Sequence, residues 1–569
     1  MKKLFLASFF ALLSLYAYAY DFEVNGIYYN KTGDNTVEVT NFSYNYKRYT
    51  GDIVIPNSVK RASKEYSVAS IGKEAFWGCN GLTAIDIPAS VTSIGDHAFD
   101  YCSGLTAINI PASVTNIGEF AFVGCSGLTA IDIPASMTSI GISTFYGCSS
   151  LTEINIPTSV TSIGENAFWG CSDLTEINIP ASVTSIGNHA FWGCSSLTAI
   201  DIPASVTSIG ENAFGSCEGL TAIVVANGNS VYDSRNNCNA IIKTRDNSLV
   251  SGCKNTVIPA SVTSIRNYAF SHCSGLTEIN IPASVTSIGE NAFSWCDDLT
   301  SIVVASGNSV YDSRNNCNAI IKTRDNSLVS GCKNTVIPAS VTSIGDHAFA
   351  YCSGLTEIDI PASVTSIENY AFQFCSGLTE IDIPASVTSI GDHAFSGCSG
   401  LTAIDIPKGV TSIGDYAFQN CSGLTAIDIP ESVTSIGKGA FSGCSRLTAI
   451  KIPEDVTSIG YSAFDGCDSL TDIYCYGFTP AWTVFNHPFS PITYSNSTLH
   501  VPYGTVDAYR VADGWKEFTH IVEFDPTGVE AISADGKSAA EQRIYNLGGV
   551  RMATPQHGLN IINGKKVVY

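Results

Sequence analysis

Histidine and aspartate recur as neighbours in this 569-residue chain, and such pairs can perform general acid–base chemistry. His97, His347 and His393 each follow an aspartate, and His189 occupies the same place in a repeated pattern. Side chains at i and i+1 point apart, and no serine or cysteine nucleophile has a specified place beside them. No GxSxG, HExxH, glycine-rich phosphate loop or EF-hand sequence is present. The sequence therefore predicts no enzyme, no catalytic residue, no metal site and no cofactor.

Cysteine is the second residue type with chemical potential, and most of the 20 cysteines are regularly spaced. Those in the regular column are 23 residues apart, except for two steps of 56: Cys79, Cys102, Cys125, Cys148, Cys171, Cys194, Cys217, Cys273, Cys296, Cys352, Cys375, Cys398, Cys421, Cys444 and Cys467. No CxxC pair occurs, so metal binding is not indicated. Because free cysteine is among the most buried residue types, we expect these thiols to pack inside as small hydrophobes.

The cysteines belong to a repeat that accounts for most of the chain. Residues 82–104 read LTAIDIPASVTSIGDHAFDYCSG, and residues 105–127 read LTAINIPASVTNIGEFAFVGCSG. A fixed period in the twenties is typical of a solenoid in which each repeat forms one turn. Ile85 and Ile87 alternate with polar or small residues, which predicts a strand with one buried face that ends at Pro88.

The rest of each turn completes a three-sided unit. Val91 and Ile94 predict a second extended segment, and Ala98, Phe99 and Cys102 suit one helical or 3₁₀ turn that packs inward. Stacking copies at about the 4.8 Å strand spacing would place like residues above like. We therefore expect a right-handed, β-rich solenoid with continuous internal columns of Leu, Ile, Val, Phe and Cys.

The pattern IxIPxxVTxIGxxAFxxCxxL resembles the BspA-like leucine-rich repeats of surface proteins from Bacteroides-type bacteria and some mucosal parasites. The match extends from about Ile71 to Leu470. The flanks resemble the caps of that family, and the last residues resemble the C-terminal sorting tails of exported Bacteroidota proteins. The expected organisation is a β-rich N-terminal cap at 20–70, repeats at 71–473 with β-hairpin insertions at about 227–258 and 306–337, a C-terminal cap at 474–525, and a linker and β-like tail at 526–569.

The N-terminus predicts export. Residues 1–19 combine Lys2 and Lys3, an apolar core from Leu4 to Leu15, and the small-x-small site Ala17-Tyr18-Ala19. The apolar run is short for a membrane span, so we expect none after cleavage. The net charge of −22, without a basic run, disfavours nucleic acid and anionic lipid as partners. The expected location is secreted or at the cell surface.

The two longer cysteine steps contain near-identical insertions. Residues 223–265 recur at 302–344 with one change, Asn227 for Ser306. Each copy holds CNAIIKTRDNSLVSGC, which predicts a hairpin around an Arg-Asp-Asn turn. Such a hairpin would place two cysteine pairs opposite each other as candidate disulfides, a hypothesis that the sequence leaves open: Cys238 with Cys253, and Cys317 with Cys332.

The outward positions of the first strand predict an acidic ribbon along the array. Its candidate binding residues are Asp86, Asp132, Glu153, Glu176, Asp201, Asp359, Asp382, Asp405 and Asp428. Sheet faces of solenoids commonly bind partners, which favours a recognition surface. The alternative is a solvated face that keeps the array soluble, and calcium bridging between stacked carboxylates is a lesser one.

Aromatic residues form a second candidate surface. Trp77, Tyr146, Trp169 and Trp192 share the position before Gly-Cys, so Trp169 and Trp192 should lie on adjacent turns. A flat stack of rings can dock sugar rings or protein loops, and the alternative is packing on the convex shoulder.

The resemblance implies an exported surface-binding protein, an adhesin whose partners would be host matrix proteins, epithelium or other bacteria. A glycan-binding accessory protein and a structural surface component without a discrete ligand are the alternatives.

Overall fold

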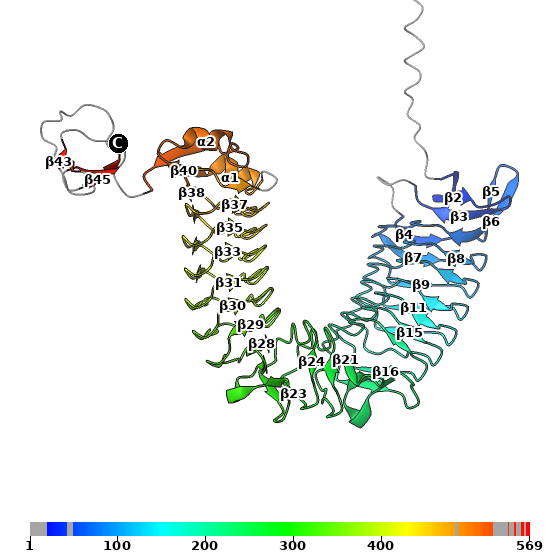
Figure 1. The fold of residues 1–569 in the computed structure, drawn as a ribbon. Helices are drawn as coiled ribbons and strands as arrows, with labels where there is room; N and C mark the ends of the chain where they lie inside the picture. Colours follow the sequence, from blue (N-terminus) through cyan, green and yellow to red (C-terminus); the bar gives the residue numbers. More distant parts are fainter. Residues whose placement is uncertain are drawn as a thin grey trace, which may run out of the picture. The chain divides into compact units, whose positions relative to one another are not determined.

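The computed structural model describes residues 20–42, 49–483 and 487–526, together with four short strands near the C-terminus. The predicted signal peptide and most of the predicted linker and tail lie outside the described residues. The chain forms two compact units, Met1–Leu299 with Ala305–Asn308, and Thr300–Val304 with Ser309–Tyr569. Both are stacks of short parallel strands (Figure 1).

Unit 1 begins with a β-rich cap that continues directly into the stack. Its strands are β1 (Phe22–Val24), β2 (Ile27–Lys31), β3 (Thr36–Thr40), β4 (Gly51–Val54), β5 (Ser58–Arg61) and β6 (Lys64–Ile71). β1, β2 and β3 are antiparallel neighbours, whereas β6 runs parallel to β3. β4 and β6 then pair in parallel with the two strands of the first repeat, so the cap provides a hydrogen-bonding edge for each strand.

Each regular turn places one strand on a first face and a shorter one on a second face. In unit 1 the first-face strands are β7 (Leu82–Asp86), β9 (Ala107–Asn109), β11 (Ala130–Asp132), β13 (Glu153–Asn155), β16 (Ala199–Ile202), β18 (Ala222–Val225) and β23 (Glu278–Ile281). The second-face strands are β8 (Ser93–Ile94), β10 (Asn116–Ile117), β12 (Ser139–Ile140), β14 (Ser162–Ile163), β15 (Ser185–Ile186), β17 (Ser208–Ile209), β22 (Ser264–Ile265) and β24 (Ser287–Ile288). Neighbouring strands pair residues that are one repeat apart in the sequence, so Ile85 lies beside Ile108.

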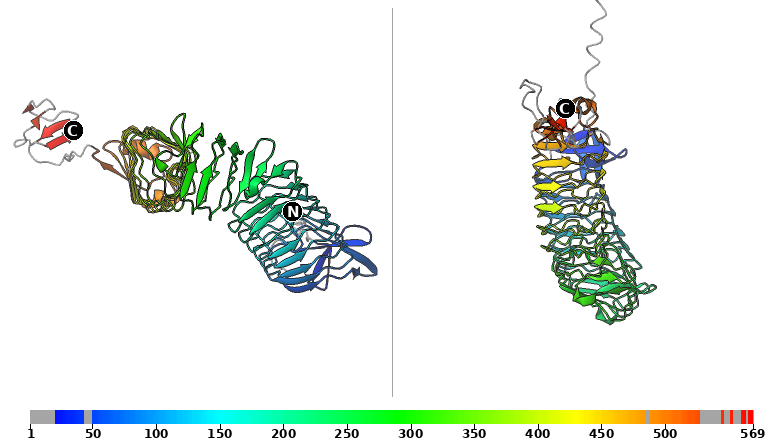
Figure 2. Two further views of the ribbon diagram at one scale, coloured as in Figure 1. Left: turned by 90° about the horizontal axis from the view of Figure 1, so that it is seen from below. Right: turned by 60° about the vertical axis from the view of Figure 1, so that its left-hand side comes forward.

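Unit 2 repeats this arrangement, and its turns superimpose when viewed end-on (Figure 2). Its first-face strands are β32 (Ala403–Asp405), β34 (Ala426–Asp428), β36 (Ala449–Ile452), β38 (Asp472–Cys475), β40 (Thr498–Pro502) and β41 (His520–Phe524), preceded by β25 (Ser301–Val304) at its start. Its second-face strands are β29 (Ser343–Ile344), β30 (Ser366–Ile367), β31 (Ser389–Ile390), β33 (Ser412–Ile413), β35 (Ser435–Ile436), β37 (Ser458–Ile459) and β39 (Trp482–Thr483). Helices α1 (Pro491–Asn496) and α2 (Val506–Val511) close its end.

The predicted internal columns are confirmed. In the turn that begins at Leu82, the side chains of Leu82, Val91, Ile94, Phe99 and Cys102 are all buried. The phenylalanine rings form one continuous stack in unit 2, from Phe349 to Phe489, and a stack in unit 1 that the first insertion interrupts between Phe214 and Phe270. In unit 1, for example, the rings of Phe76 and Phe99 are 5.0 Å apart and nearly parallel. Repetition of the same side chains therefore produces the core that one turn could not form alone.

The third side of each turn, expected as one helical or 3₁₀ turn, is not a continuous helix. It is a run of separate tight turns, in which the amide of Cys102 donates to the carbonyl of Phe99. His97 and Tyr101 have positive φ values of 55° and 57°, which interrupts a right-handed helix. The amide of Phe99 donates to the carbonyl of Ala121 at 2.8 Å, so the corners are hydrogen-bonded between turns as the strands are.

The first insertion forms β19 (Tyr232–Asp233), a 3₁₀ turn at Arg235–Asn237, β20 (Ala240–Lys243) and β21 (Ser248–Gly252). β20 and β21 form the predicted antiparallel hairpin. β21 also pairs in parallel with β22, which places Leu249 beside Ile265 in the core column. The insertion thus contributes a shortened turn to the stack. The second copy has β26 (Tyr311–Asp312), β27 (Ile320–Lys322) and β28 (Ser327–Ser330), and β28 pairs with β29 in the same way.

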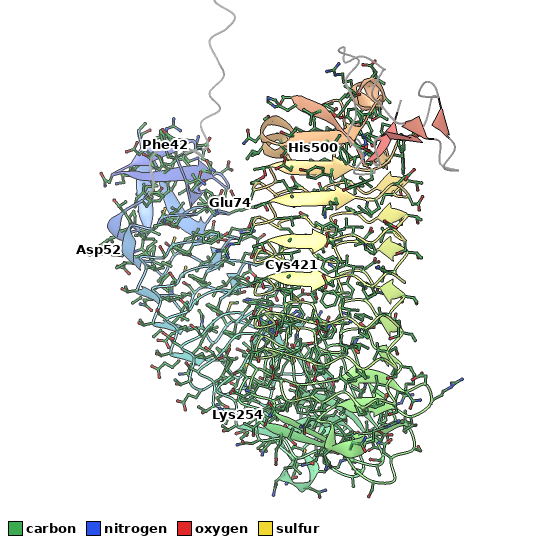
Figure 3. The ribbon with its side chains drawn as sticks, turned by 90° about the vertical axis from the view of Figure 1, so that its left-hand side faces the viewer. Phe42, Asp52, Glu74, Lys254, Cys421 and His500 are labelled. Carbon is green, nitrogen blue, oxygen red and sulfur yellow. The ribbon has the colours of Figure 1, made fainter. Side chains whose placement is uncertain are left out.

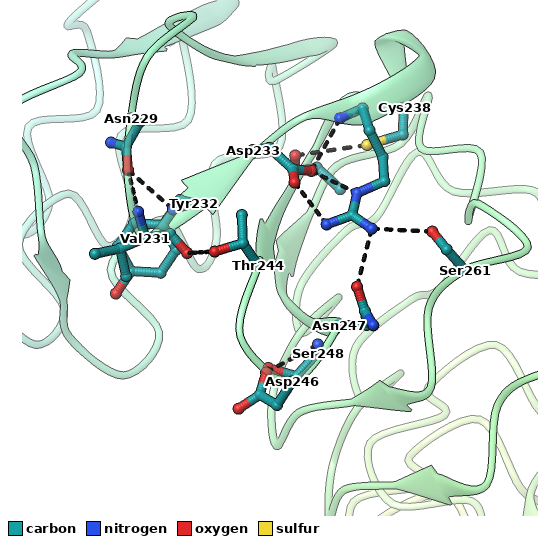
Figure 4. A network of polar contacts seen from close by, with 12 residues as sticks. Asn229, Val231, Tyr232, Asp233, Cys238, Thr244, Asp246, Asn247, Ser248 and Ser261 are labelled. Atoms are coloured by element: carbon teal, nitrogen blue, oxygen red, sulfur yellow. Dashed lines mark hydrogen bonds and ion pairs between the residues drawn. The ribbon is translucent and has the colours of Figure 1, made fainter.

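A polar network holds each insertion in shape, and Figure 4 shows the network of the first one. The guanidinium of Arg235 donates two hydrogen bonds to the carboxylate of Asp233, at 2.8 and 2.6 Å. It also donates to Asn247 and Ser261, 2.9 and 3.2 Å away. Arg314 makes the equivalent bonds in the second copy. Because bidentate pairs fix orientation as well as charge, the arginine links the hairpin to the following turn.

Four strands near the C-terminus form a separate small sheet: β42 (Ile544–Tyr545), β43 (Arg551–Met552), β44 (Leu559–Ile562) and β45 (Lys565–Val568).

Candidate functional site

A groove on the first face of unit 1 gathers four of the candidate binding residues. It has a volume of about 460 Å³ and crosses β11, β13, the extended segment at 176–178 and β16. We call it the acidic groove and define it by its polar lining: Asp132, Glu153, Asn155, Glu176, Asn178 and Asp201.

The groove follows from strand alternation and from the sizes of the stacked residues. Ile131 and Ile154 are neighbours that point inward, so the residues on either side of each point outward. Glu153 lies in register with Ala130. Ala199 lines the opposite end. The longer glutamates are therefore flanked by alanines, which leaves room between the turns.

All the charged residues that line the acidic groove are negative. Its lining holds four carboxylates and two amides, and none of its lining residues is lysine or arginine. Carboxylates on successive turns, about 5 Å apart, reinforce one another's field. Such a surface attracts a basic partner and repels an acidic one. Of the other unit 1 candidates, Asp86 is exposed on β7 but does not line the groove.

In unit 2 the acidic ribbon ends at Asp428, the last of its candidate residues. Asp405 and Asp428 are in register on β32 and β34, and the next residue in the column is Lys451. The ammonium of Lys451 lies 3.7 Å from the carboxylate of Asp428. Asp359 and Asp382 are exposed on the preceding turns. The acidic ribbon of unit 2 therefore ends at a cation, which one further step of 23 residues along the sequence would have identified.

Beyond Lys451 the same column becomes aromatic. The rings of Tyr474 and His500 stack at 4.2 Å on neighbouring strands of the first face, which Figure 3 shows face-on with His500 labelled. His500 Nε2 lies 2.8 Å from a carboxylate oxygen of Asp472 and lowers the pKa of that group. This end of unit 2 therefore differs in chemistry from the acidic groove.

The predicted tryptophan pair is stacked on adjacent turns. The rings of Trp169 and Trp192 are 5.2 Å apart, and Tyr146 stacks on Trp169 at 5.7 Å. Both tryptophans are half-buried. The column continues through His272, whose ring is 4.8 Å from Trp192 and 4.0 Å from Trp295. The rings thus cover one another's faces, which favours a packing role.

His272 and Trp295 were missed by the sequence analysis. Both stand where other turns have glycine directly before the column cysteine, so the aromatic pattern shifts by one position. Gly215 occupies the tryptophan position in the turn that follows Trp192, and a Cβ on Gly215 would overlap with the Trp192 ring. Burial lowers the pKa of His272 to about 4.

The contacts of the neighbouring Asp392 and His393 hold successive turns together. Asp392 accepts a hydrogen bond from the amide of Asp415 on the next turn, at 2.8 Å. His393 stacks between Tyr370 and Tyr416 at 4.7 Å on either side. The aspartates therefore link successive turns. A histidine–carboxylate contact does occur within one corner, because His97 Nδ1 lies 2.9 Å from Asp100 Oδ2.

The column cysteines are explained by one recurrent contact. The thiol of Cys102 donates to the carbonyl of Phe76 at 3.1 Å, and the same bond recurs along both stacks. Cys273 and Cys352, which follow the insertions, are half-buried, whereas the others in the column are buried. The residue at this position must be small, largely apolar and able to donate inward, which cysteine satisfies.

The insertion cysteines are free thiols in the structure. Cys238 donates to the carbonyl of Ala240 at 3.6 Å, and Cys253 donates to that of Asn239 at 3.4 Å. The disulfide stays a prediction.

Within the described residues, no cluster of three or more histidine, cysteine, aspartate or glutamate side chains is arranged to hold a metal ion. Across the same part of the chain, no helix has the length and apolar character needed to span a membrane.

The stacked turns, with inward Leu, Ile, Phe and Cys columns, define a leucine-rich-repeat solenoid. Six matches to the model of the BspA type leucine rich repeat region cover residues 37–161, 69–198, 138–244, 247–325, 325–422 and 365–479. The chain belongs to this family, whose membership suggests a protein-binding surface protein.

Several solved structures with detectable similarity are bacterial proteins. A leucine-rich cell surface protein from Faecalibacterium prausnitzii is 28% identical, with 80% of this chain and 94% of that one covered and a TM-score of 0.37. A leucine-rich repeat protein from Bacteroides ovatus is 26% identical, with 89% and 100% covered and a TM-score of 0.33. The pneumococcal vaccine antigen PcpA is 18% identical, with 89% and 98% covered and a TM-score of 0.35. A comparison with curated proteins gave no significant match.

Proposed function

We propose that this protein is an exported surface adhesin that binds a basic region of a protein partner through the acidic groove. The partner would be a host matrix protein, an epithelial surface protein or a protein on another bacterium. The proposal rests on the acidic groove, which no lysine or arginine lines. Its carboxylates are Asp132, Glu153, Glu176 and Asp201.

The physical basis is repetition of a weak contact. Each turn offers one or two outward polar groups, so the affinity should grow with the number of turns that a partner engages. A field from several like charges also accelerates encounter with a basic surface, and this effect is screened over about 8 Å at physiological ionic strength. Binding should therefore be strong at low salt and decline as salt rises.

The glycan-binding alternative, as the sequence analysis framed it, depends on Trp169 and Trp192. Their half-buried, mutually stacked rings leave little free face for a sugar, so this pair does not favour it. A structural surface component without a discrete ligand would show no saturable binding to any partner.

The test is a binding screen of the protein without residues 1–19 against immobilised fibronectin, fibrinogen, laminin and collagen, and against epithelial and bacterial cells. Any saturable partner is then titrated with a variant that carries D132N, E153Q, E176Q and D201N. We expect this variant to lose at least about tenfold in affinity at low salt, equivalent to roughly 1.4 kcal/mol, and wild-type binding to weaken in high salt.

A matched control removes the same number of charges elsewhere on unit 1. The variant E119Q, E165Q, E211Q and E290Q changes four exposed carboxylates at the corners, outside the acidic groove. It should bind as the wild type does. Equal losses in both variants would show that net charge, and not the groove, controls binding, and normal binding by the groove variant would refute the proposal.

A further inference from the structure

We propose a second binding site on unit 2, a trough at the end of its second face that takes a neutral saccharide. The trough has a volume of about 820 Å³ and ends at Trp482. It shares no residue with the acidic groove, so either proposal can fail without the other.

The floor of the trough is a column of glycines. Gly414, Gly437 and Gly460 lie on successive turns and all line it. A Cβ on Gly437 would come within 2.6 Å of the backbone of Gly414 and of Asp415, and Gly460 is equally close to the turn before it. A side chain at any of these three positions would require the neighbouring backbone to shift, and the three glycines leave a shallow channel.

One wall of the trough is built by the residue that follows each glycine. Along the stack these residues are Asp392, Asp415, Lys438 and Tyr461, and all four are exposed. Asp415 Oδ1 accepts a hydrogen bond from the amide of Lys438 at 2.7 Å, which fixes the carboxylate. The Lys438 ammonium lies 5.4 Å from the centre of the Tyr416 ring. This wall therefore presents fixed acceptors, a donor and an aromatic edge.

The other wall begins as serines and ends in a tryptophan. Ser435 and Ser458 occupy the outward position of the second-face strands, and Trp482 follows in register with Ser458. Trp482 is 67% exposed and Tyr461 is 41% exposed. Two large rings thus stand in solvent at the same end of the channel.

Neither ring is required by the repeat. In unit 1 the corresponding channel, about 460 Å³ in volume, has glycines at 210 and 289 with Arg266 in the glycine position between them, and serines at 264 and 287, but no aromatic side chain lines it. The stack therefore forms without aromatic residues at these positions. Exposed aromatic residues that stacking does not need suggest selection for a ligand.

The chemistry of the lining fits a sugar ring. A pyranose has an apolar C–H face that packs on an aromatic plane, and an edge of hydroxyls that both donate and accept. Two carboxylates against one ammonium make the charge nearly balanced, unlike the acidic groove. A glycine floor offers no deep pocket for an anchoring peptide side chain, but a flat ring can lie in it.

The experiment uses the full chain without residues 1–19. A microarray of defined neutral and acidic oligosaccharides is combined with affinity electrophoresis in gels that contain β-glucan, galactomannan or xylan. We expect retention by at least one neutral saccharide, and a loss of at least about tenfold in affinity for W482A. W482F should retain part of the binding, and 0.5 M NaCl should change it less than about twofold because the contacts are not between net charges.

Y503A serves as the matched control, because Tyr503 is 47% exposed and lies outside the trough. It should bind as the wild type does, and thermal unfolding should show that W482A remains folded. The proposal is wrong if no saccharide in either assay binds the wild type, or if W482A binds as well as the wild type. A protein ligand that W482A loses while no saccharide binds would also overturn it.

Discussion

The thiol of Cys125 donates a hydrogen bond to the backbone carbonyl of Phe99, 26 residues earlier in the chain, at 3.1 Å. The same carbonyl also accepts from the amide of Cys102. One cysteine therefore completes the hydrogen bonding of the preceding corner while it fills the core. This explains why the residue recurs in every regular turn.

The column thiols should be unreactive in the folded protein. Burial raises the pKa of Cys148 and of Cys398 to about 12, so almost no thiolate exists at pH 8. Iodoacetamide at pH 8 should leave both unmodified, and both should react fully in 6 M guanidinium chloride. Peptide mass spectrometry measures each site, and rapid labelling of either cysteine under native conditions would contradict the packing.

The insertion cysteines have a separate test. The sequence predicts that Cys238 and Cys253 can be linked, and Cys317 and Cys332 likewise. If the protein is secreted in oxidised form, a non-reducing peptide map should contain both linked pairs. Free thiols at all four positions in protein recovered from the culture medium would end the hypothesis.

Acid should destabilise unit 1 through His272. Its pKa is about 6.5 when unfolded and about 4 in the fold, because burial disfavours the charged ring. Above pH 6.5 both states are neutral and nothing is lost. As the pH falls from 6.5 to 4 the unfolded state binds the proton more readily, so stability declines, by roughly 2 to 3 kcal/mol at pH 4.5.

The substitution H272F should remove this part of the acid sensitivity. Thermal unfolding followed by circular dichroism at pH 7.5 and 4.5 gives the loss in Tm between the two conditions. That loss should be smaller in H272F than in the wild type, while H520Q, at an exposed histidine, should match the wild type. An unchanged loss in H272F would show that other groups control acid unfolding.

The duplicated insertion supplies an internal control for the arginine network. R235A should expose β20 and β21 to faster amide hydrogen exchange, because it removes the bonds to Asp233, Asn247 and Ser261. The copy around Arg314 keeps its network in the same molecule and should exchange at the wild-type rate. Peptides that span the one changed residue, Asn227 or Ser306, allow the copies to be assigned by mass.

The acidic ribbon of unit 2 should contribute to binding unevenly. The single substitution D382A should change the affinity for a confirmed basic partner little. Neutralising Asp359, Asp382, Asp405 and Asp428 together should lower that affinity. The ion pair with Lys451 reduces the contribution of Asp428, so K451Q should strengthen binding at low salt. Titration of these variants at two salt concentrations tests both statements. Weaker binding by K451Q would argue that the partner contacts the lysine.

Much of the fold could be predicted because each side chain in a regular turn packs against the equivalent side chains of the neighbouring turns. The inward residues Leu82, Ile85, Val91 and Phe99 recur at fixed spacing, and a column of identical apolar residues has only one way to be buried. The acidic groove followed from the same alternation, since outward carboxylates on a parallel ladder must lie side by side.

Features that depend on contacts between unlike segments could not be predicted. The left-handed φ at the position of His97 is also adopted by Phe120 and Tyr268, bulky residue types that rarely adopt it, and hydrogen bonds to the next turn fix it. The shortened turn in the first insertion has Gly252 in the phenylalanine position, where a Cβ would overlap with the ring of Phe270. Sequence spacing alone does not show that a hairpin strand joins the main stack.

The two insertions also bear on how the gene can change length. Ser248 lies beside Ser264, and Ser327 lies beside Ser343, in equivalent parallel ladders. Unequal crossing-over between the two copies would remove 79 residues, the distance between Ile223 and Ile302, and the join would retain the local sequence of either copy. Strains of the source organism could then carry shorter or longer arrays whose strands remain in register at the junction.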